Sequence, residues 1–218
     1  MAQLRVNPTR MELKKLQIRY NTARRGHKLL KDKRDELMRQ FLEVVRDYKA
    51  LRQKVEDALS EVYGSFSAAA ALSGPKMLEE ALILPKKEGE LYVDKKNLMS
   101  VTVPVFDFRL KGQSAADSYN YGFAFTSGEL DASLSSLSGV LEDMVRLAEK
   151  EKTAQLLAEE IERTRRRVNA LEYIMMPQYL AAIKSIKMKL DENERGNTTR
   201  LMKVKDMMLK EQMNYSEE

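Results

Sequence analysis

The sequence predicts a mainly α protein, in which a long antiparallel two-helix coiled coil carries a small central globular insert containing a short β-hairpin. Two observations lead to this prediction. Near both ends of the 218-residue chain, apolar residues recur with alternating spacings of three and four, which is typical of a coiled coil. Between these segments, residues 64–139 hold seven of the nine glycines and three of the five prolines, so the coiled coil is interrupted there.

The first predicted helix covers residues 9–66. Its heptad repeat is sustained, and only His27 and Arg34 are out of character for a buried seam. A helix of this length would extend for roughly 87 Å at about 1.5 Å per residue, so it needs a partner of similar length to bury its stripe. The seam positions are Leu13, Leu16, Tyr20, Ala23, His27, Leu30, Arg34, Leu37, Phe41, Val44, Tyr48, Leu51, Val55, Ala58 and Val62.

Two signals mark the start of this helix. Thr9 and Glu12 have the spacing of a capping box, in which the hydroxyl caps the first turn. Asn7 as the cap, with Pro8 at the first helical position, fits equally well. Either signal predicts a start within a few residues of position 9.

The second predicted helix begins near a further capping box, Thr126 with Glu129. Its stripe changes phase before Ala154 and again near Pro177, where the missing backbone donor predicts a kink. The stripe residues are Leu130, Leu134, Leu137, Leu141, Met144, Ala148, Ala154, Leu157, Ile161, Thr164, Val168, Leu171, Met175, Ile183, Ile186, Leu190, Val204 and Met207.

The insert contains one clear strand signal, because residues 99–108 alternate and are rich in β-branched and aromatic side chains. Pro104 restricts this strand to a sheet edge or a small hairpin, and residues 119–125 are a candidate second strand. The predicted division is an N-terminal coiled-coil helix (1–72), the insert (73–127), a C-terminal coiled-coil helix (128–212) and a tail (213–218).

Composition excludes several classes of protein. There is no cysteine, so disulfides and thiolate metal sites are absent. No apolar run approaches the roughly 18 residues of a membrane span, and the N-terminus lacks the apolar core of a signal peptide. The sequence therefore predicts a soluble, cytoplasmic protein without direct membrane insertion.

No catalytic, cofactor-binding or metal site is predicted. The single histidine, His27, occupies a seam position, where a core or partner-contacting role is favoured over catalysis, since no second histidine or cysteine can complete a site. The loop at Gly112 lacks the lysine and the spacing of a phosphate-binding motif. The protein is therefore predicted to be no enzyme.

Charge is distributed unevenly along the chain. Residues 1–34 carry a net charge of +9, residues 35–162 carry −8, residues 163–210 carry +7 and the tail carries −3. In an antiparallel hairpin the two basic segments would lie side by side. The simplest interpretation is a solvated helix face. Nucleic-acid binding has weak support because no aromatic residue flanks Arg165, Arg166 and Arg167, and docking into an acidic or polar protein cavity fits at least as well.

Two segments of the chain are especially specific: RRGHKLLKDKRDEL at 24–37 and EEIERTRRRVNALEYIMMP at 159–177. They strongly resemble the D subunits of the V-type and archaeal-type rotary ATPases, and the length of the chain looks like that of a prokaryotic member of this family. The resemblance also covers 7–16, 186–195 and 199–205, and within the insert 99–104 and 129–131. It therefore extends over both predicted helices.

The resemblance implies a central rotor shaft, or central stalk, that couples ATP hydrolysis or synthesis to proton or sodium transport. In this family the paired terminal helices stand inside the ring of nucleotide-binding A and B subunits. The F subunit binds the side of the shaft, and a funnel-like subunit joins it to the membrane rotor ring. The chain would then be a non-catalytic, peripheral component at the cytoplasmic face of the membrane, with no nucleic-acid partner.

We hypothesise that five basic residues meet the catalytic ring, since mobile basic side chains make weak, exchangeable contacts. A coiled-coil scaffold or tether without motor function remains the alternative, and a nucleic-acid-binding hairpin is a third. The five residues are Lys28, Arg34, Arg165, Arg166 and Arg167.

Overall fold

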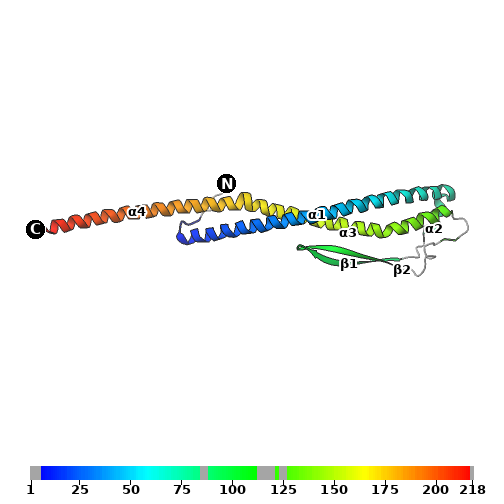
Figure 1. Cartoon of the computed structure of the whole chain (residues 1–218), viewed down its shortest axis with the longest axis horizontal. Coiled ribbons are helices and arrows are strands. Elements are labelled where there is room, and N and C mark those ends of the chain that lie inside the picture. The colour runs from blue at the N-terminus through cyan, green and yellow to red at the C-terminus, as the bar shows by residue number, and fades with distance from the viewer. Residues whose placement is uncertain (1–5, 84–87, 112–120, 123–126, 217–218) are drawn as a thin grey trace. The chain divides into compact units, whose positions relative to one another are not determined.

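The computed structural model describes residues 6–83, 88–111, 121–122 and 127–216. Helices α1 (Arg10–Ser73) and α2 (Pro75–Leu82) precede strands β1 (Glu88–Leu98) and β2 (Val101–Lys111), and then come α3 (Gly128–Ala170), the π-helical turn η2 (Leu171–Met175) and α4 (Met176–Ser216) (Figure 1). The prediction of a mainly α fold with a β-hairpin is therefore confirmed. The four-part division of the chain stays a prediction.

The chain forms two compact units. The central unit is Asp35–Glu162, and the terminal unit combines Met1–Arg34 with Arg163–Glu218. Helices α1 and α3 each contribute residues to both units. Each unit therefore combines helical segments that are far apart in the sequence.

The start of α1 is capped by Thr9. The backbone N–H of Glu12 donates to Thr9 Oγ1 at 3.2 Å, and the N–H of Leu13 donates to the Thr9 carbonyl at 3.0 Å. This geometry makes Thr9 the cap, as the capping-box spacing predicted, in preference to Asn7. In the second helix Thr126 lies outside the described residues, and α3 begins at Gly128.

Helix α1 continues past the predicted residue 66 to Ser73. The alanines at positions 68–71 explain the extension, because alanine has the highest helix propensity. Gly74 then takes a φ of 82° and donates its N–H to the Ala70 carbonyl at 3.0 Å. A residue without a side chain adopts this left-handed conformation at little cost, so the helix ends there.

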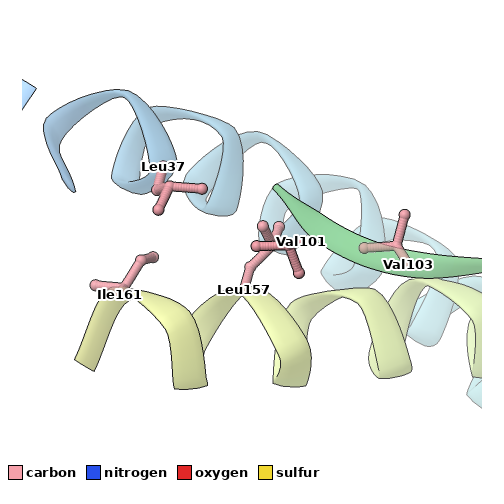
Figure 2. Close-up of a cluster of buried hydrophobic side chains, with 5 residues drawn as sticks. All are labelled: Leu37, Val101, Val103, Leu157 and Ile161. Atoms are coloured by element: carbon pink, nitrogen blue, oxygen red, sulfur yellow. The ribbon is translucent and has the colours of Figure 1, made fainter. Parts of the chain in front are cut away.

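The core of the central unit forms where three elements meet. Leu37 of α1, Val101 and Val103 of β2, and Leu157 and Ile161 of α3 converge in one buried cluster (Figure 2). Leu37 and Leu157 are fully buried, at 0% exposure. Burying each such side chain contributes about 1.5–3 kcal/mol, so this cluster holds the hairpin on the helices.

The two helices of the central unit are antiparallel. Lys54 of α1 pairs with Asp143 of α3 at 2.6 Å, whereas Asp47, earlier in α1, pairs with Lys150, later in α3, at 3.7 Å. Buried residues on α1 include Leu37, Val55, Val62 and Ala69, all at seam positions or one heptad beyond. The heptad repeat therefore identified the buried stripe of α1.

The hairpin pairs β1 with β2 in an unbroken antiparallel register from Glu88↔Lys111 to Leu98↔Val101. Met99 and Ser100 form the turn, both with positive φ, as a two-residue type I′ connection requires. The Ser100 N–H donates to Asn97 Oδ1 at 2.9 Å. Pro104 thus lies in a two-stranded hairpin, as predicted.

The partner of the predicted strand differs from the expected one. Of the candidate segment 119–125, only residues 121–122 are among the described residues, whereas β2 pairs with Glu88–Leu98. Strand β1 gave a weak signal because nearly all its side chains are exposed. Its sequence therefore lacks the apolar alternation of a strand with one buried face.

A second buried cluster lies at the end of the central unit where α1 ends and α3 begins. Ala69 of α1, Leu78 of α2 and Leu130 of α3 are buried together, with Leu134 packed against them. Helix α2 carries Pro75 in its first turn, where the missing N–H costs nothing. This short helix thereby covers the position where α1 ends and α3 begins.

The terminal unit also pairs its helices antiparallel. Arg10 of α1 contacts Glu194 of α4 at 3.3 Å, and His27, later in α1, contacts Glu172 of η2 at 3.2 Å. The buried apolar residues of this unit are few: Leu16, Val168 and Ile186. Its helix pair therefore buries far fewer apolar side chains than the helix pair of the central unit.

The phase change predicted near Pro177 has a structural cause. The N–H of Met176 bonds to the Leu171 carbonyl, which makes η2 a π-helical turn, and such a turn inserts one extra residue. The predicted seam residue Met175 is consequently exposed. The kink expected at Pro177 stays a prediction.

The seam also ends earlier in α4 than predicted. Val204 and Met207 are exposed, as are Leu137 and Met144 of α3. Residues 197–210 of α4 are exposed throughout, so this part of the helix has no partner among the described residues. The apolar pattern there does not indicate a seam within the chain.

Candidate partner-binding surfaces

The five basic residues predicted to contact partners all belong to the terminal unit. Lys28 and the three arginines at 165–167 are exposed, and Arg34 is half-buried. Thr164 and Val168, which flank the triplet, are buried. The seam therefore turns inward on both sides of the triplet and leaves its three guanidinium groups on the outer surface.

His27 lies at the seam, is half-buried, and makes a polar contact across it. Its ring Nε2 is 3.2 Å from Glu172 Oε2, and its side chain is 19% exposed. The residue thus joins α1 to η2 by a polar contact. The core or partner-contacting role of His27 stays a prediction.

Exposed apolar side chains accompany the basic ones on the terminal unit. Met11, Ile18 and Leu29 are exposed on α1, and Met11 and Ile18 are one heptad apart on the side opposite the seam. The exposed apolar residues near the end of α4 are Leu201, Met202, Val204, Met207, Met208 and Leu209. Apolar patches rimmed by charge are typical of protein-binding surfaces.

The far end of the central unit has the opposite charge. Residues 56–83 and 128–145 together carry nine carboxylates against a single lysine. Tyr63, Leu72 and Ile83 are exposed in the same part of the unit. This part of the unit, which includes the cluster of Ala69, Leu78 and Leu130, therefore exposes both acidic and apolar side chains.

Away from its turn, the hairpin has a charged region on the face that also carries the buried Val101 and Val103. Glu90 accepts hydrogen bonds from Lys111 and from the Tyr92 hydroxyl, and the Arg109 guanidinium lies 5.4 Å from the centre of the Tyr92 ring. The hydrogen bond from Lys111 holds the pKa of the Glu90 carboxyl below its ordinary value. The same carboxylate raises the pKa of Tyr92, so this region is a connected polar network.

The other face of the hairpin is apolar. The register places Leu91 opposite Phe108, Val93 opposite Phe106, and Gly89 opposite Leu110. A Cβ at Gly89 would lie 2.7 Å from Phe108 Cε2, so the ring packs directly over the glycine backbone. Sequence reasoning missed this face, although the run Leu91-Tyr92-Val93 after Gly89 is a short strand signal.

Within residues 6–83, 88–111, 121–122 and 127–216, no three His, Asp or Glu side chains are grouped so as to hold a metal ion. None of the helices described is both long and apolar enough to cross a membrane.

Comparison with known proteins gives a consistent family. A family model described as the D subunit of ATP synthase matches residues 12–206. The chain is 58% identical over 217 residues to the V-type ATP synthase D subunit of Acetivibrio thermocellus, covering 100% of this chain and 98% of the relative. It is 56% identical over 210 residues to that of Clostridioides difficile, with coverages of 96% and 94%. The identity is 53% over 212 residues to that of Clostridium botulinum, with coverages of 97% and 98%.

Proposed function

The chain belongs to the family of ATP synthase D subunits, and from this premise we propose that it is the central rotor shaft of a V-type ATP synthase. As a shaft it transmits torque between a ring of nucleotide-binding A and B subunits and the membrane rotor that moves protons or sodium ions. It performs no catalysis itself. It works at the cytoplasmic face of the membrane, in the soluble sector of the complex.

The observation that supports a shaft best is the antiparallel pairing of helices in each unit. Helix α1 continues without a break from residue 34 to 35, and α3 from 162 to 163, so each helix belongs to both units. Pairs such as Lys54–Asp143 and His27–Glu172 join the helices within the separate units. A helix pair resists bending and twisting better than a single helix, which torque transmission requires.

The charge of the terminal unit supports contact with the catalytic ring. Exposed arginine and lysine side chains form weak, salt-screened contacts, which a rotor can exchange among three equivalent surroundings. In this proposal Lys28, Arg34, Arg165, Arg166 and Arg167 face the ring. The exposed apolar side chains at the end of α4 lie against the same partners.

The remaining surfaces suit the other two partners of the rotor. The F subunit binds the side of the shaft, and the acidic and apolar end of the central unit, with Tyr63, Leu72 and Ile83 exposed, seats on the funnel-like subunit of the membrane rotor. A shaft should copurify at one copy per complex with the ring and the small subunit. A scaffold or nucleic-acid-binding protein should not.

Charge reversal of the triplet tests the proposed ring contact. Arg165, Arg166 and Arg167 are replaced by Glu, the complex is reconstituted, and ATP hydrolysis and single-molecule rotation are measured. Because all three side chains are exposed, we expect folding stability to change by at most about 1.5 kcal/mol, or about 0.5 kcal/mol for each substitution, while coupled hydrolysis and rotation are reduced.

The matched control is the same charge reversal at exposed positions of the central unit, Arg46, Lys49 and Lys152. We expect this variant to keep its rotation. Unchanged coupling in the triplet variant would remove the assignment of these residues to the ring.

A further inference from the structure

The outer edge of strand β1 is open. In the part of the chain that the structure describes, the sheet has two strands only, and no third strand lies beside β1 (Figure 1). The edge is long, at 11 residues, it is paired one-to-one with β2 without a bulge, and it contains no proline. Leu91, Tyr92 and Val93 at its centre are 48%, 50% and 55% exposed. A long, regular edge without proline can accept another strand, and the five charged side chains of β1 restrict the registers in which it can do so.

The register identifies the backbone groups that face this edge. The N–H of Phe106 donates to Glu149 of α3 at 3.0 Å, so it points away from β1. Val93 is opposite Phe106, and in such a non-hydrogen-bonded pair both residues turn their N–H and C=O groups outward. The other outward-facing residues of β1 alternate with period two. They are Gly89, Leu91, Lys95 and Asn97.

From this edge we infer that β1 pairs antiparallel with β1 of a second copy of the chain, centred on Val93, which produces a four-stranded sheet. The outward N–H and C=O groups of Val93 then bond to those of Val93 in the second copy. Glu90 of each copy lies opposite Lys96 of the other, so two pairs of opposite charge form across the new interface. The inference is independent of the proposed function and concerns the chain before it joins other subunits.

Charge selects this register over its neighbours. Of the five two-fold centres from residue 91 to residue 95, four oppose like charges: Glu88 with Asp94, Glu90 with Asp94, Asp94 with itself, or Lys95 with itself. Only the centre at Val93 avoids every such conflict while pairing Glu90 with Lys96. Like charges directly opposite each other destabilise a sheet. The strand is therefore self-complementary in one register.

Sedimentation equilibrium of the full chain measures this association. Because the new interface is small, we expect a dissociation constant between about 1 μM and about 1 mM. Lys96→Glu places Glu opposite Glu90 twice and should weaken the dimer about tenfold. The double variant Glu90→Lys with Lys96→Glu restores opposite charges and should recover most of the loss. A chain that stays monomeric throughout this range, or a dimer that Lys96→Glu leaves unchanged, would overturn the inference.

Single-cysteine variants test the register directly, because the chain contains no cysteine. In Val93→Cys the two thiols meet at the two-fold axis, where paired Cα atoms are about 5.5 Å apart, a separation that a disulfide can bridge. In the matched control Leu91→Cys the offset along the strands is about 13 Å. We expect oxidation to crosslink the first variant and not the second. Equal crosslinking of both, or of neither, would contradict the register centred on Val93.

Discussion

The terminal and central units each pair two helical segments through buried apolar side chains, but they differ in net charge. The terminal unit carries 23 Lys and Arg against 10 Asp and Glu, and the central unit carries 15 against 23. Their net charges are therefore +13 and −8. Under the proposed function, this opposite charge suits the two units to partners of different chemistry.

The units differ as strongly in their cores. Among the described residues, the central unit buries eleven apolar side chains and the terminal unit three. The terminal unit nonetheless exposes fourteen large apolar side chains, against thirteen in the central unit. The central unit therefore has the larger core of its own, whereas the terminal unit leaves most of its large apolar side chains exposed.

The largest expected effect comes from the central cluster. Leu157→Ala removes a fully buried side chain that meets Leu37 and Val101, and such truncations cost about 2–5 kcal/mol because a cavity remains. Urea unfolding followed by circular dichroism measures the loss. Leu16→Ala in the terminal unit is the matched control, and we expect it to cost about half as much because a lone helix pair relaxes more easily. A larger loss of stability in Leu16→Ala than in Leu157→Ala would contradict the difference between the two cores.

The hairpin attachment should have the next largest effect. Glu149→Ala leaves the Phe106 N–H without its carboxylate acceptor, which lies at 3.0 Å, and hydrogen bonds to charged groups contribute about 1.5–3 kcal/mol. We expect the Phe106 amide to exchange faster with deuterium, as read by NMR. Glu149→Gln keeps an oxygen acceptor and should show a smaller change. Unaltered exchange in the Ala variant would mean that the helix does not anchor β2 there.

The polar contact across the terminal seam should matter less. Glu172→Gln removes the charge that faces His27 at 3.2 Å, on side chains that are 19% and 44% exposed. A partly solvated pair of this kind contributes about 0–1 kcal/mol. We therefore expect a shift in the thermal midpoint smaller than that of Leu16→Ala. A loss as large as that of Leu157→Ala would show that this seam depends on the pair.

The smallest effect concerns the charged region of the hairpin. The hydrogen bond from Lys111 depresses the pKa of Glu90 in the folded chain, so its stabilising contribution is present at neutral pH and is lost as pH falls through the folded pKa. Carboxyl NMR shifts should show Glu90 titrating below its ordinary pKa of about 4.3. Lys111→Met should return the titration toward that value. A Glu90 pKa that is the same in both chains would contradict the contact.

Much of the fold could be predicted from patterns within short stretches of the sequence. Thr9 caps α1 because its hydroxyl is three residues from Glu12, and Leu37, Val55 and Val62 are buried because the heptad places them on one stripe. Pro104 correctly limits its strand to a hairpin. Each of these features depends on a short window of residues, which is why the pattern alone was sufficient.

The missed features depend on contacts or on a break in regularity. Strand β1 has almost no buried face, so its apolar pattern is weak, and the π-helical turn appears in the sequence only as a change of phase near Pro177. Val204 and Met207 follow a helical stripe in the sequence, yet this part of α4 has no partner helix among the described residues. The five predicted partner-contact residues remain a hypothesis, although all five lie in the basic unit.

Hydrogen exchange by mass spectrometry on the free chain and on the assembled complex tests the central claim most directly. In the free chain we expect amides around Leu37 and Leu157 to be protected, and those around Leu16, Val168 and residues 197–210 to exchange at least about tenfold faster, since local packing sets local stability. Assembly should slow exchange in the terminal unit and leave the central cluster almost unchanged. Equal protection of both units in the free chain, with no further change on assembly, would contradict the account.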